Sequence, residues 1–193
     1  MKKILTLCLV FCVALVGYGQ KTYQLASPNG EIKMNVKVSD KIQYDIFYGE
    51  ESLLEKGTMR MQVGGQVLGK NPKVVKSTTR LVDENIHPVV PFKFSTIRNH
   101  YNQLLLKFSG NWSVEFRAFD DGVAYRFITN KKGEVEVNKE LFQVDFPEDY
   151  QMHIQQSGDF GTNYELFYEH PQYSEWKGKK GVTLLPMLIE AKN

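Results

Sequence analysis

The feature that most constrains the fold is the alternation of apolar and polar residues between Ile97 and Ile128. Successive side chains leave a pleated strand on opposite sides, so this period of two predicts half-buried β-strands. Asp121-Gly122 lies between two alternating runs and favours a tight hairpin turn, because such turns need positive φ. The stretch therefore predicts an antiparallel meander. The residues expected on its core face are Leu104, Leu106, Phe108, Val114, Phe116 and Ala118.

Shorter alternating runs follow the same pattern along the rest of the chain, and none shows a sustained helical period. Lys70–Thr79 reads as a loop leading into an edge strand, and Arg80–Phe94 as a long connection, because Pro88 and Pro91 exclude a central strand. Many short strands separated by turns predict an all-β sandwich. The further strands are expected at 23–38 (a hairpin turning at 27–30), 42–48, 50–54, 59–67, 133–146, 151–155 and 182–189, with Val135, Val137, Leu141, Phe142 and Val144 as core candidates.

The first nineteen residues have the composition of a secretory signal peptide. Lys2-Lys3 precedes the apolar run Ile4–Val16, and Gly17-Tyr18-Gly19 supplies small residues before a cleavage site. Export would remove both cysteines, Cys8 and Cys12, which excludes disulfides and thiolate metal sites in the mature chain. It would also reduce Lys+Arg from 24 to 22, equal to the 22 Asp+Glu. The mature chain would then have no excess of positive charge, so its composition does not indicate a nucleic acid or an anionic membrane as partner.

Known catalytic patterns are not found, and no catalytic residue is predicted in this chain. A Gly-x-Ser-x-Gly elbow and a glycine-rich phosphate loop are both missing from the sequence. The four histidines, at 87, 100, 153 and 170, are scattered without the spacing of a zinc site. Asp120-Asp121 is explained by turn chemistry. Glu115 and Arg117 share one strand face and are expected to form a solvated or cross-strand ion pair of little net energy.

The segment Gly158–Trp176 shows neither the strand nor the helix period. Carboxylates bind hard cations such as calcium, aromatic faces stack on sugar rings, and long irregular loops are often functional. The competing interpretation is a loop that covers one end of the sandwich with its aromatic side chains. The residues alone leave both interpretations open. The acids and aromatics concerned are Asp159, Glu165, Glu169, Glu175, Tyr164, Phe167, Tyr168, Tyr173 and Trp176.

Four stretches together resemble the N-terminal domain of glycoside hydrolase family 97, whose members are exported α-glucosidases and α-galactosidases. They occur in the family's order over nearly all of the mature chain. The stretches are Ser27-Pro28-Asn29-Gly30, Ile97–Asn102, Phe116–Phe127 and Gly158–Glu165.

The resemblance implies an antiparallel β-super-sandwich of the galactose-mutarotase type over 20–193, incomplete at its C-terminus, after the signal peptide at 1–19. In complete members this domain packs on a (β/α)₈ barrel that holds the catalytic carboxylates and most ligands of a calcium ion. The N-terminal domain adds one glutamate to that calcium. Glu165 matches it, in a segment one residue longer than the family pattern, and Glu169 is the fallback. The resemblance thus implies a periplasmic, calcium-dependent, exo-acting α-glycosidase whose substrate is an α-linked oligosaccharide, with this chain inactive alone.

Two other functions stay open on sequence grounds. The chain could be a free-standing carbohydrate-binding sandwich that uses the aromatic segment, or a purely structural or interaction domain. An epimerase, which the mutarotase-like fold suggests, needs a positioned histidine and glutamate as acid and base. No histidine placement matches that requirement, and a shared fold does not transfer a function.

Overall fold

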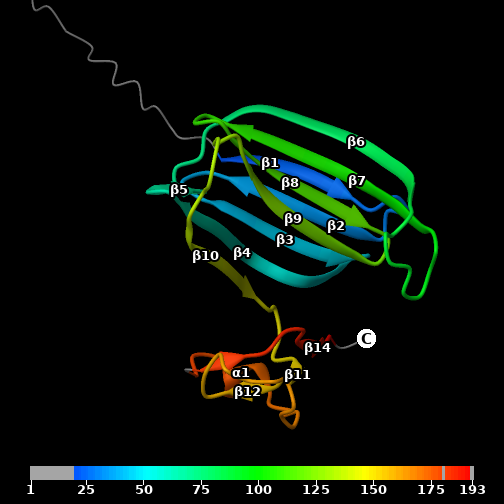
Figure 1. The fold of residues 1–193 in the computed structure, drawn as a ribbon, viewed down its shortest axis with the longest axis vertical. Helices are drawn as coiled ribbons and strands as arrows, with labels where there is room; N and C mark the ends of the chain where they lie inside the picture. Colours follow the sequence, from blue (N-terminus) through cyan, green and yellow to red (C-terminus); the bar gives the residue numbers. More distant parts are fainter. Residues whose placement is uncertain (1–19, 180, 192–193) are drawn as a thin grey trace, which may run out of the picture.

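The computed structural model describes residues 20–179 and 181–191, so the predicted signal peptide at 1–19 lies outside the described residues. Within these ranges the chain forms a β-sandwich with a smaller unit beneath it (Figure 1). The part of the chain that the structure describes contains no helix long and apolar enough to cross a membrane. The prediction of an all-β antiparallel sandwich is confirmed.

The larger sheet of the sandwich has six strands in the order β1-β2-β3-β4-β10, with the short strand β5 paired to the end of β4 on the side opposite β10. All of its pairings are antiparallel, and the predicted hairpin between Tyr23 and Val38 is formed by β1 and β2. Its strands are β1 (Lys21–Ala26), β2 (Ile32–Val38), β3 (Ile42–Tyr48), β4 (Glu51–Val63), β5 (Gln66–Leu68) and β10 (Val137–Asp145).

The second sheet has four strands in the order β6-β7-β8-β9, and it contains the predicted meander. Phe119 pairs with Gly122 across the β8–β9 turn, as the Asp-Gly signal indicates. The strands are β6 (Val74–Ile86), β7 (Ile97–Phe108), β8 (Trp112–Phe119) and β9 (Gly122–Thr129).

The inner faces of the two sheets form one hydrophobic core. All six meander residues that the alternation assigns to the core are buried, and Phe108 stacks on Trp112 with ring centroids 4.1 Å apart. From the larger sheet, Met34, Val36 and Ile42 are buried against them. Each such side chain contributes about 1.5–3 kcal/mol of transfer free energy.

The turn at Asp120 joins the two sheets at one end of the sandwich. The Asn29 backbone N–H donates to Asp120 Oδ1 at 2.9 Å, which connects the β1–β2 turn to the β8–β9 turn. The interpretation of Asp120 as turn chemistry is therefore supported, and the carboxylate has a structural task.

Three local expectations were wrong. Arg80–Ile86, expected in a connection, continues edge strand β6, because the prolines follow only after Ile86. Met59–Val63, expected as a separate strand, is the end of the long strand β4. Val137 and Phe142, expected in the core, are 55% and 57% exposed, because β10 is an edge strand of the larger sheet.

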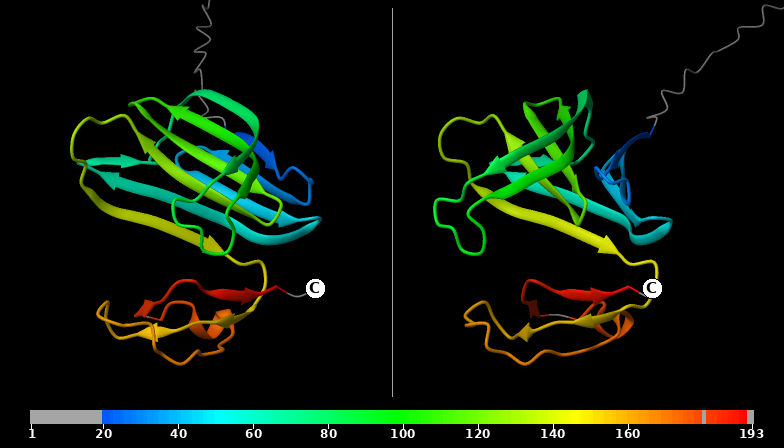
Figure 2. Two further views of the ribbon diagram at one scale, coloured as in Figure 1. Left: turned by 45° about the vertical axis from the view of Figure 1, so that its right-hand side comes forward. Right: turned by 90° about the vertical axis from the view of Figure 1, so that its right-hand side faces the viewer.

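A smaller unit follows β10 and lies beneath the sandwich in both views of Figure 2. The expected final strand at 182–189 is split into β13 and β14 around Pro186. The unit consists of two short antiparallel ladders, β11 with β14 and β12 with β13, and one helical turn. Its elements are β11 (Gln151–His153), β12 (Gln156–Ser157), α1 (Tyr173–Trp176), β13 (Val182–Thr183) and β14 (Leu188–Glu190).

Glu115 is buried, with 1% of its surface exposed, so the expectation of a solvated ion pair was wrong. Its carboxylate accepts hydrogen bonds from Arg117 Nε at 2.7 Å, from Arg126 Nε at 2.6 Å and from the Gln103 amide. Gln103 in turn accepts from Arg80 Nε at 2.7 Å. Arg126 is Glu115's cross-strand neighbour, so the cross-strand part of the expectation was right. The network crosses all four strands on the outer face of the sheet.

Burial raises the pKa of the Glu115 carboxyl, but hydrogen bonds from Arg117, Gln103 and Arg126 outweigh burial and hold the pKa below its ordinary 4.5. A folded-state pKa below the unfolded one means that the unfolded chain takes up the proton first. The stabilisation is therefore complete above pH 4.5 and is lost as the pH falls through the lowered folded-state pKa.

We predict that Glu115→Gln lowers the free energy of unfolding at pH 7 by about 2 kcal/mol, because Arg117 loses a charged partner in a half-buried site. Urea denaturation should also show a flatter dependence on pH below 4.5 in the variant than in the wild type. Glu50→Gln is the matched control, since the Glu50 side chain is 98% exposed, and its effect should stay within about 0.5 kcal/mol. Equal stability of all three proteins at pH 7 would contradict the structural role of Glu115.

Candidate functional site

The segment singled out in the sequence forms a long loop held at its base by antiparallel pairing. We call residues Gly158–Glu169 the aromatic loop. The chain returns from this loop along β11: Ile154 and Glu169 exchange backbone hydrogen bonds of 3.0 and 2.8 Å, and the Met152 N–H donates to the Pro171 carbonyl at 2.9 Å. Strand β11 therefore has β14 on one side and the returning chain on the other.

The base of the loop is anchored by a small core. Tyr150, Met152 and Ile154 are buried on one face of β11. Phe146 packs edge-to-face against Tyr150 and Tyr173, with centroid distances of 5.9 and 5.0 Å. This packing joins the end of the sandwich to the smaller unit, so the loop projects from a fixed support.

The last acid of the segment has a structural task. Glu175 lies in the single turn of α1, where its Oε2 accepts from the Gln172 N–H at 3.0 Å. Asp149 accepts from the backbone N–H and the hydroxyl of Ser174, both at 2.7 Å. Glu175 is thus occupied in capping the helical turn.

Glu165 lies at the outer part of the aromatic loop. Its Oε2 accepts a hydrogen bond from Asn163 Nδ2 at 2.9 Å, and its side chain is exposed. The intervening Tyr164 has φ of 60°, a left-handed conformation that is uncommon for a bulky residue. Strained backbone of this kind concentrates at functional sites. The backbone of Glu169, by contrast, is bound into the ladder with Ile154.

The aromatic side chains of this loop face solvent. Phe160 and Phe167 are 91% and 96% exposed, and Tyr164 and Tyr168 are more than half exposed. For these four residues the interpretation in which the aromatics cover the end of the sandwich is therefore wrong, whereas Tyr173 does pack there against Phe146. Exposed apolar groups in such a concentration mark an interaction surface.

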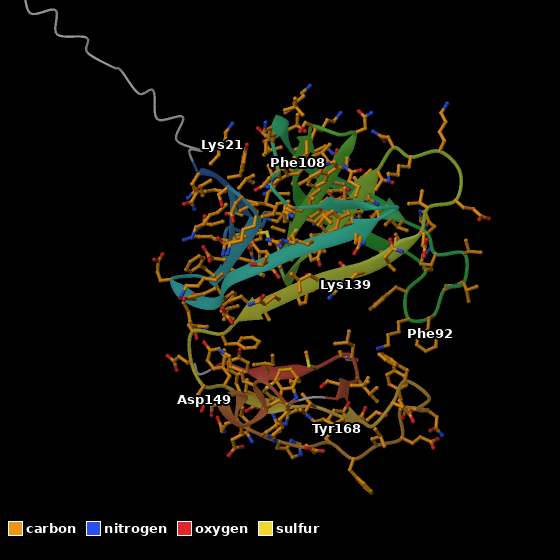
Figure 3. All side chains as sticks on the ribbon, turned by 90° about the vertical axis from the view of Figure 1, so that its left-hand side faces the viewer. Lys21, Phe92, Phe108, Lys139, Asp149 and Tyr168 are labelled. Atoms are coloured by element: carbon orange, nitrogen blue, oxygen red, sulfur yellow. The ribbon has the colours of Figure 1, made fainter. Side chains whose placement is uncertain are left out.

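The connection between β6 and β7 carries a second exposed apolar set. Val89 is fully exposed, and Val90, Phe92 and Phe94 are each at least 66% exposed. This connection and the aromatic loop extend from the same side of the molecule in the right-hand view of Figure 2. Figure 3 places Phe92 at the lower end of the sandwich, toward the unit that carries Tyr168. Both loops therefore present exposed apolar side chains.

The carboxylates of the loop do not converge. Among residues 20–179 and 181–191, no group of three or more His, Cys, Asp or Glu side chains could hold a metal ion. Asp159 is engaged by the Gly161 N–H at 2.8 Å, within its own turn. Glu165 has the oxygen donors that calcium prefers, and a single carboxylate fits the role of one ligand among several. That Glu165 binds calcium stays a prediction.

An apolar hollow of about 420 Å³ opens between the two sheets where β9 and β10 do not pair. Its lining includes the rings of Tyr44, Tyr125 and Phe142 and no carboxylate or imidazole. The Tyr125 hydroxyl donates to Glu140 at 3.0 Å at its edge. The hollow belongs to the core of the sandwich.

Sequence reasoning missed one pair of potential ligands. The histidines were judged to be scattered, yet the structure brings His153 and His170 together, with their Nδ1 atoms 2.7 Å apart. The pairing depends on the register between β11 and the chain that returns from the aromatic loop. No local motif in the sequence signals that register.

Comparison with known proteins decides the family. The family model for the glycosyl-hydrolase 97 N-terminal domain matches residues 25–193. The chain belongs to the glycosyl-hydrolase 97 N-terminal family. The resemblance found in the four sequence stretches is thereby confirmed. A curated relative, a retaining alpha-galactosidase from Bacteroides thetaiotaomicron, is 32% identical over 200 residues, which cover 99% of this chain. The chain spans only 30% of that relative's length.

Solved structures share the fold of this family member. A glycoside hydrolase family 97 enzyme from Pseudoalteromonas sp. strain K8, in complex with acarbose, aligns with a TM-score of 0.63 and 19% identity over 77% of this chain and 24% of that chain. A beta-arabinopyranosidase aligns with a TM-score of 0.67 and 23% identity, over 76% and 26%. These similarities show a common sandwich in this glycoside hydrolase family 97 domain.

We predict that this family 97 domain by itself binds calcium only weakly, with a dissociation constant above about 1 mM, because calcium takes six to eight oxygen ligands. Isothermal titration calorimetry of the purified chain with CaCl₂ tests this. Micromolar affinity would contradict the assignment of Glu165 as one ligand of a site shared with another domain.

Proposed function

We propose that this chain is the N-terminal domain of an exported α-glycosidase, docked on a catalytic barrel to which it contributes Glu165 as one calcium ligand. The observation that carries the proposal is the aromatic loop: it is fixed at its base and exposed at its outer part, and it presents a carboxylate among apolar side chains. Family membership supplies the class of enzyme. The chain alone is proposed to be inactive.

The loop's own residues explain how such a carboxylate would be positioned. Asn163 donates a hydrogen bond to one carboxylate oxygen of Glu165 and so restricts the rotation of the carboxylate. The other carboxylate oxygen does not take part in that bond. The left-handed Tyr164 turns the chain between them. The pairing of Ile154 with Glu169 limits the movement of the loop. Calcium, when bound, would supply a fixed positive charge near the substrate's oxygens.

Exposed side chains on both loops would provide the contact with the barrel. Phe160 and Phe167 from one loop, and Val89 and Phe92 from the other, are more than 90% exposed. Burying them would contribute transfer free energy of about 1.5–3 kcal/mol for each large side chain. The exposure of these apolar side chains supports a permanent domain interface, in preference to a site that stays open to solvent.

The substrate class is proposed from the curated relative. A retaining alpha-galactosidase at 32% identity supports an α-linked galactoside as substrate, in preference to a glucoside, with retention of configuration. Retention requires two carboxyl groups about 5–5.5 Å apart, and we propose that both lie on the barrel. The basic n-region and apolar run before Gln20 support export to the periplasm.

A free-standing carbohydrate-binding module is the second candidate, and the exposed rings of Tyr164 and Phe167 favour it. Such a module would retain an α-linked oligosaccharide without any barrel. Affinity electrophoresis of the isolated chain separates the two functions. Retention that Tyr164→Ala or Trp176→Ala abolishes would establish the module, whereas our proposal expects no retention.

In the protein translated from the complete gene, we predict that Glu165→Gln lowers kcat/KM for an α-galactoside by at least about tenfold and raises the calcium concentration needed for half-maximal activity, because one charged ligand is lost. Glu169→Gln is the matched control and should behave as the wild type.

The outcomes of this assay are distinct. Loss in Glu169→Gln with none in Glu165→Gln would transfer the role to the fallback residue. Wild-type behaviour of both variants would contradict a calcium ligand in this loop, and a reading frame without a barrel after Asn193 would overturn the enzyme assignment.

A further inference from the structure

His153 and His170 face each other directly across the base of the aromatic loop. Ile154 with Glu169, and Met152 with Pro171, occupy the hydrogen-bonded positions of this antiparallel pairing. The position between them is the non-hydrogen-bonded one, where opposed side chains come closest. His153 and His170 occupy it, with ring centroids 4.8 Å apart and Nδ1 atoms 2.7 Å apart.

A carboxylate lies beside one of the two rings. Glu190 on β14 has its Oε1 3.1 Å from Nε2 of His153. A neutral imidazole carries its proton on one nitrogen, and a carboxylate partner selects the nitrogen that faces it. The ring N–H geometry does not make this contact a hydrogen bond, so Glu190 acts on His153 through its charge alone. A carboxylate, a histidine and a metal in series form a recurrent metal-site arrangement.

We propose that His153 and His170 bind a divalent transition-metal ion through their Nδ1 atoms, with Glu190 as the positioning residue. Imidazole nitrogen suits copper, nickel and zinc and is a poor ligand for calcium, so this site is separate from the calcium role of Glu165. Without a metal ion, the same two atoms share a hydrogen bond. The ion takes the place of the shared proton, and each neutral ring then carries its one proton on Nε2.

The two nitrogens lie close enough for one ion to bind both of them. Two nitrogens at about 2.05 Å from an ion lie about 2.9 Å apart when they subtend a right angle and about 3.3 Å apart at the tetrahedral angle of zinc. The observed 2.7 Å is the separation of a direct hydrogen bond, so the two rings would move apart slightly to admit an ion. No third His, Cys, Asp or Glu of the described ranges joins the pair, so water completes the coordination.

Both ligands are reachable from solvent. The His153 side chain is 22% exposed, that of Glu190 is 58% exposed, and His170 is an exposed residue. A bound ion would join β11 to the chain returning from the aromatic loop, and so tighten the support of Glu165. Two protein ligands imply an affinity on the order of micromolar rather than the much tighter binding of four-ligand structural sites.

The test is calorimetric titration of the purified chain, without a polyhistidine tag, with CuCl₂, NiCl₂ and ZnCl₂ at pH 7.5. We expect one Cu²⁺ or Ni²⁺ ion to bind per chain. The affinity should be at least tenfold weaker in His170→Ala and in His153→Ala, and it should be unchanged in His87→Ala. Cys8 and Cys12 are shared by all variants, so the difference isolates the histidines. In the copper complex, electron paramagnetic resonance should show hyperfine coupling to two nitrogens.

Glu190→Gln provides a second measurement that does not depend on the ligands themselves. We expect its copper affinity to fall about tenfold while its melting temperature without metal stays that of the wild type. Equal copper binding by the wild type and His170→Ala, or a signal without nitrogen coupling, would overturn the proposal. Neither result would affect the calcium role of Glu165, since that role is measured by activity and by a different ion.

Discussion

Everything at the candidate site depends on the antiparallel pairing of residues 150–154 with residues 169–173. This pairing closes the aromatic loop, places Glu169 in a ladder and leaves Glu165 outside it. It also sets the register that brings His153 opposite His170. The pairing is short, and its stability comes from the buried face beneath it, where Tyr150, Met152 and Ile154 are excluded from water. A function in the loop thus rests on a small hydrophobic core at the loop's base.

The sandwich above this unit is a tolerant support. Its core needs alternating apolar side chains of about the right volume, and many sequences satisfy that requirement. This explains why solved relatives at 19% and 23% identity align with TM-scores of 0.63 and 0.67. The outer face of the second sheet is more specific, because Glu115 is buried there and needs all of its hydrogen-bond donors. An uncompensated carboxylate in that position would destabilise the sheet.

The fold was predictable where local chemistry decides it. Alternation and the Asp121-Gly122 turn identify the meander because both signals act within a few residues. The burial of Glu115 was not predictable, because alternation tells which face a side chain takes and not which arginines lie on the neighbouring strands. The length of β6 was not predicted, because Pro88 and Pro91 were taken to exclude a strand also from the residues before them. The exposure of Phe142 follows from its place on an edge strand, which depends on topology.

The candidate site was predictable to a smaller extent. Glu165 came from a family resemblance, and the structure adds its exposure, its bond to Asn163 and the left-handed backbone beside it. The histidine pair had no sequence signal. His153 and His170 are brought together by the register between β11 and the chain that returns from the aromatic loop, and that register exists only in the folded structure. Local sequence patterns do not predict pairings of this kind, because the paired residues are distant in the sequence.

We propose above all that this domain presents Glu165 to a calcium ion held mainly by another domain. The most direct measurement is a crystal structure of the protein translated from the complete gene, grown with calcium and with the ion identified by its anomalous signal. The account predicts an oxygen of the Glu165 carboxylate at about 2.3–2.6 Å from the ion. A calcium ion whose ligands all come from the other domain, with Glu165 turned to solvent, would contradict it.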